Sequence, residues 1–291
     1  MPTLSETDLI LNPDGSIYHL NLLPGDLATT IITVGDPDRV EQISHYFDRV
    51  ELKKQKREFV THTGYINKQR ISVISTGIST DNIDIVFNEI DALFNIDFKT
   101  RQVKDTITSL NFIRIGTAGA LQADVPLDEA ILTKYAIGFD GLLPFYEKLE
   151  SLEEEALLKA AQYDFSHYIP AQYYVAAASP SLFNIFEKQF RSGITATCGG
   201  FYAPQGRLLR ALTSKPQLIE KLNQFHFRDF RLTNFEMETA GIYGLGRVLG
   251  HHCCSLSVIV ANRITQQFSR DPQRAITRLI EQVLERVALL Q

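Results

Sequence analysis

An arginine beside a glycine turn is the first pattern in this sequence with the residue types to bind an anion. The stretch GDPDR at 35–39 follows an apolar, β-branched run. Gly35 would let a ligand approach the backbone, and the helix expected to follow would present free N–H groups. Arg39 would lie in its first turn, where a cation opposes the helix dipole unless an anion is bound. A plain strand-to-helix turn with a solvated Arg39 is the alternative.

Arg114 is the second candidate, because it interrupts the otherwise apolar run NFIRIGTAGA at 111–120. A buried arginine is costly unless it is paired. It precedes a small-residue loop that carries the Thr117 hydroxyl, and a guanidinium beside backbone and hydroxyl donors suits a phosphate. A structural ion pair with a core carboxylate is equally open. Arg57, within KKQKRE at 53–58, is typical of a solvated basic connection.

The stretch FYAPQGR at 201–207 combines an aromatic ring, an amide and a guanidinium within seven residues. Phe201 could stack on a flat ring. Gln205 could donate to a carbonyl and accept from a ring N–H, while Arg207 donates to a second oxygen. This set suits the edge of a pyrimidine. A Pro/Gly loop with core aromatics is the alternative.

Two carboxylates in NFEMETA at 234–240 are predicted to open a helix. Glu236 and Glu238 could simply cap that helix and interact with its dipole. Alternatively, one carboxylate chelates a sugar diol while Met237 packs on the ribose, or the pair serves as general acid and base. The run HHCC at 251–254 is not expected to bind a metal, because adjacent residues of a strand face opposite ways and no further ligand motif accompanies them.

Alternating strand and helix patterns must position these residues. Strands are predicted at 30–37, 70–78, 111–120, 129–138, 193–202 and 254–263. Helices are predicted at 38–47, 82–94, 151–162, 181–190, 236–249 and 271–290. Such alternation predicts one α/β domain with helices on both faces of a sheet, and ligands bind beyond the carboxyl ends of such strands. The least regular stretches are 140–175 and 203–235.

Composition narrows the class of function. The chain has 291 residues, with 29 Lys+Arg and 34 Asp+Glu, so its formal net charge is −5. A mildly acidic chain without a basic block is a poor candidate for binding nucleic acid or anionic membranes. No apolar run reaches the roughly 18 residues of a membrane span, and the first twenty residues do not resemble a signal peptide. Three cysteines without a C-x-x-C pair fit a reducing compartment, so we expect a cytoplasmic protein.

Together these motifs resemble the nucleoside phosphorylase superfamily, and its uridine phosphorylase branch most closely. The likeness runs from about Tyr18 to the C-terminus, which leaves residues 1–17 as a peripheral extension of a single domain spanning 1–291. It is carried by YHL at 18–20, GDPDRV at 35–40, REF at 57–59, STGI at 75–78, RIGTAGA at 114–120, FYAPQGR at 201–207, NFEMETA at 234–240 and VIVANR at 258–263. The family implies an α/β fold with a mixed, partly closed central sheet, and a homo-oligomer, usually a trimer of dimers with shared active sites.

The resemblance also implies the roles of particular residues. A phosphate site would consist of Gly35, Arg39, Arg114 and Thr117, with Arg57 from a neighbouring subunit. A ribose site would consist of Glu236, Met237 and Glu238, with His19 from the partner subunit. A uracil pocket would consist of Phe201, Gln205 and Arg207, lined by Ile259 and Val260. The catalytic groups would be Arg114, Glu238, Gln205 and Arg207.

The implied reaction is reversible phosphorolysis of a pyrimidine nucleoside, uridine above all, with inorganic phosphate as co-substrate and no other cofactor. Purine-specific relatives use an aspartate after the last strand, and VIVANR at 258–263 has none. Hydrolytic nucleosidases of the superfamily lack the phosphate arginines, which this chain keeps. The alternatives are a phosphorylase for another nucleoside, a hydrolytic nucleosidase, and a non-catalytic nucleoside-binding relative.

Three departures from the family pattern bear on these expectations. The tetrapeptide STDN at 79–82 replaces the usual GGPS near a subunit contact and a monovalent-cation site, which leaves cation dependence open. Ala261 is an extra residue before Asn262 and Arg263, and it is expected to shift Arg263 relative to the base. FYAPQGR replaces FYPGQER but keeps the spacing from Phe201 to Gln205 and Arg207.

Overall fold

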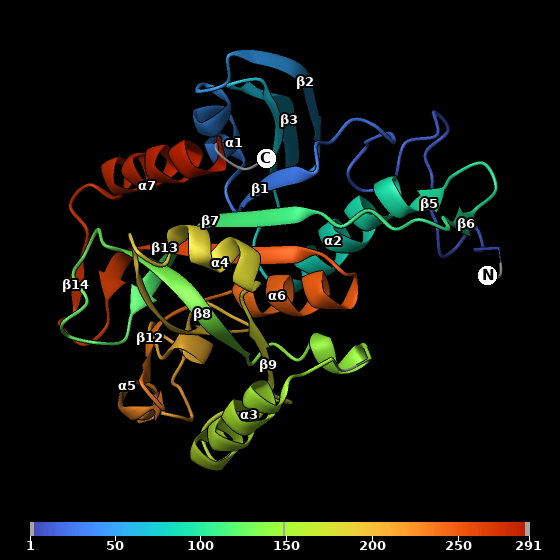
Figure 1. The fold of residues 1–291 in the computed structure, drawn as a ribbon. Helices are drawn as coiled ribbons and strands as arrows, with labels where there is room; N and C mark the ends of the chain where they lie inside the picture. Colours follow the sequence, from blue (N-terminus) through green and yellow to red (C-terminus); the bar gives the residue numbers. More distant parts are fainter. Residues whose placement is uncertain (1–2, 148, 289–291) are drawn as a thin grey trace.

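A twelve-stranded mixed sheet is the centre of the computed structural model, which describes residues 3–147 and 149–288. Its strands are β1 (Thr30–Val34), β2 (Arg49–Lys56), β3 (Phe59–Ile66), β4 (Gln69–Ser75), β7 (Asn111–Ala120), β8 (Ala130–Gly138), β9 (Tyr174–Ala177), β10 (Arg191–Thr197), β11 (His226–Phe227), β12 (Phe230–Glu236), β13 (His252–Asn262) and β14 (Gln267–Phe268). Their order is β11-β12-β10-β8-β13-β7-β1-β4-β3-β2, with β9 beside β8 and β14 beside β13. Figure 1 shows β1, β7 and β13 side by side in the middle of the molecule.

One half of this sheet closes on itself. β12 pairs in parallel with β10 and also pairs antiparallel with β7, where Asn234 and Phe235 lie opposite Ala120 and Gly119. The strands β12, β10, β8, β13 and β7 therefore form a small barrel, while β1, β4, β3 and β2 continue as an open sheet. The expected single α/β domain with a mixed, partly closed sheet is confirmed.

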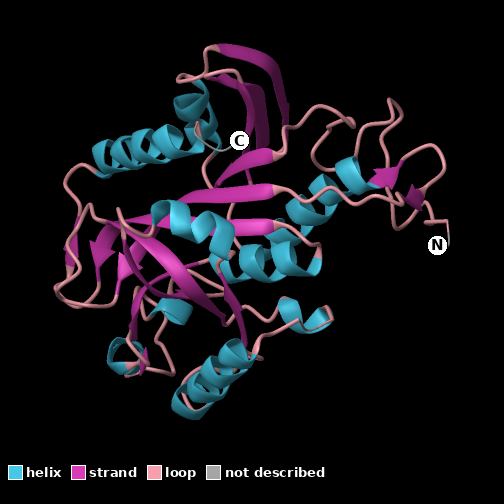
Figure 2. Ribbon diagram, in the orientation of Figure 1, coloured by secondary structure: helices cyan, strands magenta, loops and turns pink. Residues whose placement is uncertain are grey.

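Helices cover the outside of the sheet (Figure 2). They are α1 (Pro37–Ser44), α2 (Thr80–Asn95), α3 (Leu152–Phe165), α4 (Pro180–Phe186), α5 (Leu218–Gln224), α6 (Thr239–Val248) and α7 (Pro272–Val287), with 3-10 turns η1 (Leu143–Phe145) and η2 (Ala203–Gln205). α1 packs on β3 and β4, α7 on β7 and β13, and α6 on β13, β8 and β10. A two-stranded ladder of β5 (Ile96–Asp97) and β6 (Gln102–Val103) follows α2.

Burial explains which strands the sequence revealed. All five side chains of β1 are buried, because helices or neighbouring strands cover both of its faces, and such strands appear as continuous apolar runs. β2 lies at the edge of the sheet and carries the polar sequence RVELKKQK, with no buried side chain. β2 was therefore not predicted, and neither was β3, which is mostly buried but carries the partly polar sequence FVTHTGYI. Arg57 lies in the turn between β2 and β3, rather than in the irregular connection that the basic run suggested.

The six predicted strands and six predicted helices are present, with ends shifted by a few residues. Residues 289–290 of the last predicted helix lie outside the described residues. The stretches 140–175 and 203–235, expected to be the least regular, contain β9, α5 and β12, which were not predicted, besides the predicted helix α3. Two predictions about local structure were wrong. The stretch 193–202 leaves the sheet after Thr197, before Gly199 and Gly200, and the stretch 116–119 is strand rather than loop.

The N-terminal segment lies against the β5–β6 ladder at one edge of the molecule (Figure 1). The Arg101 guanidinium donates to the carbonyl oxygens of Leu4, Ser5 and Leu9. Leu9 and Ile17 are buried in the main hydrophobic core. This segment is therefore anchored to the domain. Among the helices of residues 3–147 and 149–288, none has the length and apolar character needed to cross a lipid bilayer.

Candidate active site

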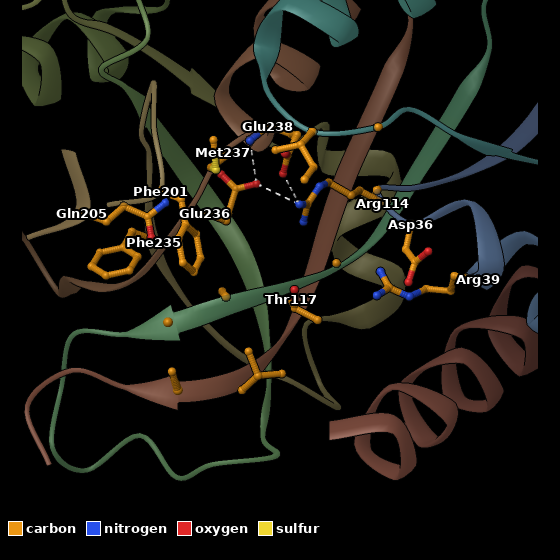
Figure 3. A pocket seen from close by; sticks show the side chains of 18 of the residues that line it. Asp36, Arg39, Arg114, Thr117, Phe201, Gln205, Phe235, Glu236, Met237 and Glu238 are labelled. Atoms are coloured by element: carbon orange, nitrogen blue, oxygen red, sulfur yellow. Dashed lines mark hydrogen bonds and ion pairs between the residues drawn. The ribbon is translucent and has the colours of Figure 1, made fainter. Parts of the chain in front are cut away.

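A cavity of about 730 Å³ opens where β1, β4, β7, β12 and β13 end or bend. Of the residues singled out in the sequence, it is lined by Gly35, Arg39, Arg114, Thr117, Phe201, Gln205, Arg207, Glu236, Met237, Glu238 and Val260. Figure 3 shows Arg39 at one end, Arg114 with the two glutamates in the middle, and Phe201 and Gln205 at the other end. Eleven residues from five sequence segments thus meet in one space, as ligand sites in α/β sheets commonly do.

Arg39 is held at one end by the β1–α1 turn. Asp36 caps α1 by accepting a hydrogen bond from the backbone N–H of Asp38 at 3.0 Å, and Pro37 starts the helix. The Arg39 side chain is buried, and its Nη1 donates to the carbonyl of Ile115 at 3.3 Å. It forms no ion pair with a carboxylate in the described part of the chain. Burial lowers the pKa of Arg39, and the nearby Arg114 cation adds to this, while the Asp36 and Glu238 carboxylates oppose it without cancelling it. A bound anion would therefore relieve an electrostatic cost.

Arg114 is paired, in contrast to Arg39. Its Nη2 lies 2.5 Å from Glu238 Oε2 and 3.2 Å from Glu236 Oε2, and its Nη1 donates to Ser257 Oγ at 3.0 Å. Burial lowers the pKa of Arg114, but the two carboxylates outweigh that effect and leave the pKa raised. The ion pair that the sequence left open is therefore present, within a cavity where Arg114 also lies near Arg39 and Thr117.

Gly116 makes room for this guanidinium. A Cβ atom at Gly116 would lie 1.8 Å from Arg114 Nη1, so a larger residue there would push the guanidinium away from its ion pairs with Glu236 and Glu238. Residues two apart on a strand point to the same side, so Arg114 and residue 116 share one face of β7, and glycine at 116 leaves space for the guanidinium. This is a packing requirement that the spacing R-I-G encodes.

The two glutamates differ in their surroundings. The Glu236 carboxylate accepts hydrogen bonds from Thr197 Oγ1, the backbone N–H of Glu238, and the backbone N–H and Oγ1 of Thr239. It is thus saturated by the turn that it stabilises at the start of α6. Glu238 accepts from the Ser79 backbone N–H at 2.9 Å and from Arg114, and keeps unoccupied lone pairs on a carboxylate that lines the cavity.

The local structure around these glutamates corrects the sequence interpretation. Residues 234–240 do not open a helix with both carboxylates in its first turn. β12 ends at Glu236, Glu238 is the N-cap residue, and α6 starts at Thr239. Met237, between the two, lines the cavity. Burial raises the pKa of Glu238, the Arg114 cation opposes this, and the Glu236 carboxylate adds to it.

The opposite end of the cavity is formed by the loop after β10. The Arg207 guanidinium carbon lies 3.7 Å from the centroid of the Phe201 ring, and its Nη1 donates to the Phe201 carbonyl at 2.9 Å and to Gln205 Oε1. This contact orients the Gln205 amide so that Nε2, which is buried and without a partner in the described residues, is free to donate. Burial, with the nearby Arg263, lowers the pKa of Arg207 to about 10.

A β-bulge in β13 shapes the wall beside this loop. The pairing of β13 with β7 shifts register between Ile259 and Ala261, at the position of the extra residue noted in the sequence. As a result Val260 and Ala261 both line the cavity, although adjacent residues of a regular strand would face opposite ways. Ile259 is fully buried in a small cluster with Ala118, Ala120, Val125 and Ile131, and does not line the cavity.

His19 and Arg57, expected to act in a neighbouring subunit's site, lie outside the cavity of their own chain. The Glu89 carboxylate accepts hydrogen bonds from the backbone N–H groups of His19 and Leu20, and its Oε1 lies 2.6 Å from His19 Nδ1. Arg57 is exposed in the β2–β3 turn with a φ of +55°. Both side chains are thus placed at the surface, one held by a carboxylate and one in a tight turn.

Several cavity residues were not identified from the sequence, namely Asp36, Glu58, Ile78, Asn82, Phe235, Ala261 and Phe268. Ser79 was also missed as a partner of Glu238. Its φ of +86° and ψ of 154° fall in a region that is almost confined to glycine. The available signal was the replacement of the usual glycine by Ser79, but a backbone N–H donor leaves no trace in residue type.

Comparisons with known proteins identify the family and the fold. A family model described as the phosphorylase superfamily matches residues 29–288. A uridine phosphorylase of Thermococcus kodakarensis is 31% identical over 264 residues, covering 88% of this chain and 81% of that protein. A uridine phosphorylase of Haemophilus influenzae is 26% identical, covering 88% and 90%. A solved Trypanosoma brucei nucleoside phosphorylase, described as showing uridine phosphorylase activity, is 28% identical with a TM-score of 0.88, covering 97% of this chain and 99% of that chain.

Proposed function

The chain belongs to the phosphorylase superfamily, an enzyme family of nucleoside phosphorylases, and from that premise we propose that it converts uridine and phosphate reversibly to uracil and ribose 1-phosphate. One observation carries the proposal. A single cavity holds a buried arginine without a carboxylate partner at one end and a buried amide donor without a partner at the other. These are the groups needed by an anionic nucleophile and by the carbonyl of a leaving base.

The phosphate would bind between Arg39, Arg114 and the Thr117 hydroxyl, close to the Gly35 backbone. Arg39 supplies a cation that forms no ion pair with a carboxylate in the described chain, and Arg114 supplies donors that its ion pairs leave free. Arg57 of a neighbouring subunit would add a further cation. Holding the phosphate beneath C1′ of the ribose converts a bimolecular attack into a positioned one.

The ribose would lie over Met237, with its 2′ and 3′ hydroxyls donating to Glu238. Arg114 and the Ser79 N–H hold that carboxylate in place from the other side. Glu236 belongs to the turn that carries Met237 and Glu238, and it supports the ribose contacts rather than making one of its own, because its oxygens are saturated. His19 of the partner subunit would reach the sugar from outside. Paired acid–base catalysis by the two glutamates is not favoured by this arrangement.

The base would occupy the end formed by Phe201, Gln205 and Arg207. As the glycosidic bond lengthens, positive charge develops on the sugar and negative charge on the uracil ring. Gln205 Nε2 would donate to a ring carbonyl and Arg207 would stabilise the developing anion. Phosphate then captures C1′, so no residue serves as a covalent nucleophile.

A pyrimidine fits this end better than a purine. Protonation of a purine leaving group calls for an acid at the base, and the residue in the corresponding region is Asn262. Its Nδ2 donates to the carbonyls of Gln122 and Val125 at 2.9 Å each, and its Oδ1 accepts from two backbone N–H groups. The Asn262 amide is therefore fully used in hydrogen bonds to the backbone, and a neutral amide is too weak an acid to protonate a leaving base.

The test is base release from a panel of nucleosides with and without inorganic phosphate. We expect uracil release from uridine only when phosphate is present, and much slower release from inosine and adenosine. Release without phosphate would indicate a hydrolytic nucleosidase. Phosphate-dependent release that favours another nucleoside would keep the reaction and replace the substrate. Binding of uridine with no release from any nucleoside would indicate a non-catalytic relative.

Shared sites in a homo-oligomer have a separate test. The variants His19→Ala and Glu238→Ala would each be inactive, one lacking a residue given to the neighbour and the other a residue of its own cavity. Mixed subunits would contain some sites with both residues intact, so mixing and reassembly should restore part of the activity. No restoration in a verified mixed oligomer would contradict site sharing.

A further inference from the structure

We propose that Arg263 is a positioning residue that fixes the base-binding loop and thereby the side chain of Gln205. The proposal deepens the proposed function and rests on it where activity is concerned. Arg263 Nη1 donates to the carbonyl of Gln205 at 2.8 Å, and Nη2 donates to the carbonyl of Gly206 at 3.1 Å. A planar guanidinium matches two successive carbonyls at the end of η2 as a fork with two parallel donors.

These two bonds are the hydrogen bonds that connect the loop to distant parts of the described chain. Within residues 199–207 the other hydrogen bonds are local, such as Gln205 N–H to the Tyr202 carbonyl and Gly206 N–H to the Ala203 carbonyl. In the part of the chain that the structure describes, both hydrogen bonds that reach 199–207 from elsewhere come from Arg263. Exposed loops held by few contacts open at low free-energy cost, so this fork decides how well the loop is ordered.

Hydrogen bonds to buried residues hold the backbone of Arg263 in place. Its backbone N–H donates to the carbonyl of Ala120 at 2.9 Å, which ties it to the end of β7. The preceding Asn262 is buried and bonded to Gln122 and Val125. The bulge at Val260 sets the register of this segment, since Ala261 pairs with Gly119 only after the shift. The extra residue in the sequence therefore places Arg263 over the loop.

Arg263 would affect the ligand only through the position of Gln205, and not by a direct contact. Arg263 does not line the cavity, and both of its terminal nitrogens are engaged by carbonyls. Gln205 is 2% exposed and keeps Nε2 without a partner, so its usefulness depends on where its backbone is held. A donor displaced by 1 Å loses most of a transition-state hydrogen bond.

The first test is a double-mutant cycle on kcat/KM for uridine. Arg263→Met keeps the length of the side chain and removes its donors, and we expect a loss of about tenfold with the KM for phosphate unchanged. In a Gln205→Met background the same change should cost less than about twofold, because nothing remains to be positioned. Arg263→Lys, which keeps the charge and one donor, should retain part of the activity. Arg270→Ala removes an exposed arginine of the same segment and serves as the control.

The second test needs no substrate. Amide hydrogen exchange over 201–207 should be faster in Arg263→Met than in the unmodified protein or in Arg270→Ala, while β7 exchanges as before. If Arg263→Met does not fold, Arg263→Lys carries both tests. Unchanged exchange over 201–207, or equal losses of activity with and without Gln205, would overturn the proposal. An inactive unmodified protein with the predicted exchange difference would contradict the uridine proposal and leave the role of Arg263 standing.

Discussion

The two ends of the cavity differ in the secondary structure that supplies their residues. At one end Arg39 comes from the first turn of α1, Arg114 from the strand β7 and Glu238 from the turn between β12 and α6. Ion pairs link Arg114 to Glu236 and Glu238. At the other end Phe201, Gln205 and Arg207 come from one loop that hydrogen bonds from Arg263 tie to the sheet. The cavity thus joins a rigid anion-binding end to a loop that needs support.

We expect this difference to divide the work of the cavity: the arginine end binds phosphate, and the loop end selects the base. Groups on strand ends are positioned by the core and tolerate little change, which suits the phosphate that every phosphorolysis shares. Loops tolerate substitution and insertion, which suits the base, the part of the substrate that differs between nucleosides. We therefore expect variants of the two ends to fail in different ways.

The largest effect is expected from Arg114→Ala. The variant loses a phosphate donor and leaves the buried carboxylates of Glu236 and Glu238 without their cation. The value of kcat/KM should fall on the order of a hundredfold or more. Breaking the buried pair should also lower the free energy of unfolding by about 3–5 kcal/mol, measured by urea denaturation. Near-normal phosphorolysis would refute the phosphate assignment.

Arg39→Ala should separate activity from stability. Arg39 is buried with no carboxylate partner in the described chain, and burial lowers its pKa, so its charge costs folding free energy. We expect the KM for phosphate to rise about tenfold or more, while the melting temperature is unchanged or higher. A melting temperature that falls as far as that of Arg114→Ala would show that both arginines are structural.

Gln205→Met tests the base end with the volume nearly conserved. It removes the unpaired Nε2 donor and the Oε1 acceptor of Arg207. We expect kcat/KM for uridine to fall about tenfold to a hundredfold, the range of a hydrogen bond to a group that gains charge. The KM for phosphate should stay the same when uridine is saturating. An equal rise in both KM values would mean that the two ends are not independent.

The smallest effect concerns the cysteines. Cys198, Cys253 and Cys254 are all buried, and burial raises the pKa of each thiol. Cys198 lies just before the loop, whereas the other two lie in the central strand β13. If the base end opens more readily, a thiol reagent followed by mass mapping should modify Cys198 first. Faster modification of Cys253 or Cys254 would reverse the comparison between the two ends.

The sequence predicted the regular, buried elements better than it predicted the edge strands and the loops. The apolar runs of β1, β7 and β13 and the amphipathic helices identified the elements that position Arg39 and Arg114, because burial on a regular element leaves a periodic pattern. The edge strand β2 and the strand β12 were missed. β2 is too polar to show burial, and β12 precedes a motif that was interpreted as the start of a helix.

Individual site residues divide in a similar way. Arg114 could be identified because a charge within an apolar segment is unusual. Glu238 was identified as one of two carboxylates expected at the start of a helix. The Ser79 N–H is a backbone group, and the support of Gln205 by Arg263 depends on two segments brought together by a bulge. Neither has a signature in residue type or spacing. The extra residue Ala261 marked the place of the bulge but not its consequence for Arg263.

The measurement that tests the central claim most directly is phosphorus NMR of the protein with uridine and inorganic phosphate. If the arginine end binds the nucleophile, the phosphate signal should convert to that of a sugar phosphate ester in step with uracil release, in equal amounts. Arg39→Ala should slow the conversion at low phosphate. Uracil release with free ribose and an unchanged phosphate signal would contradict the account, because water would then be the nucleophile.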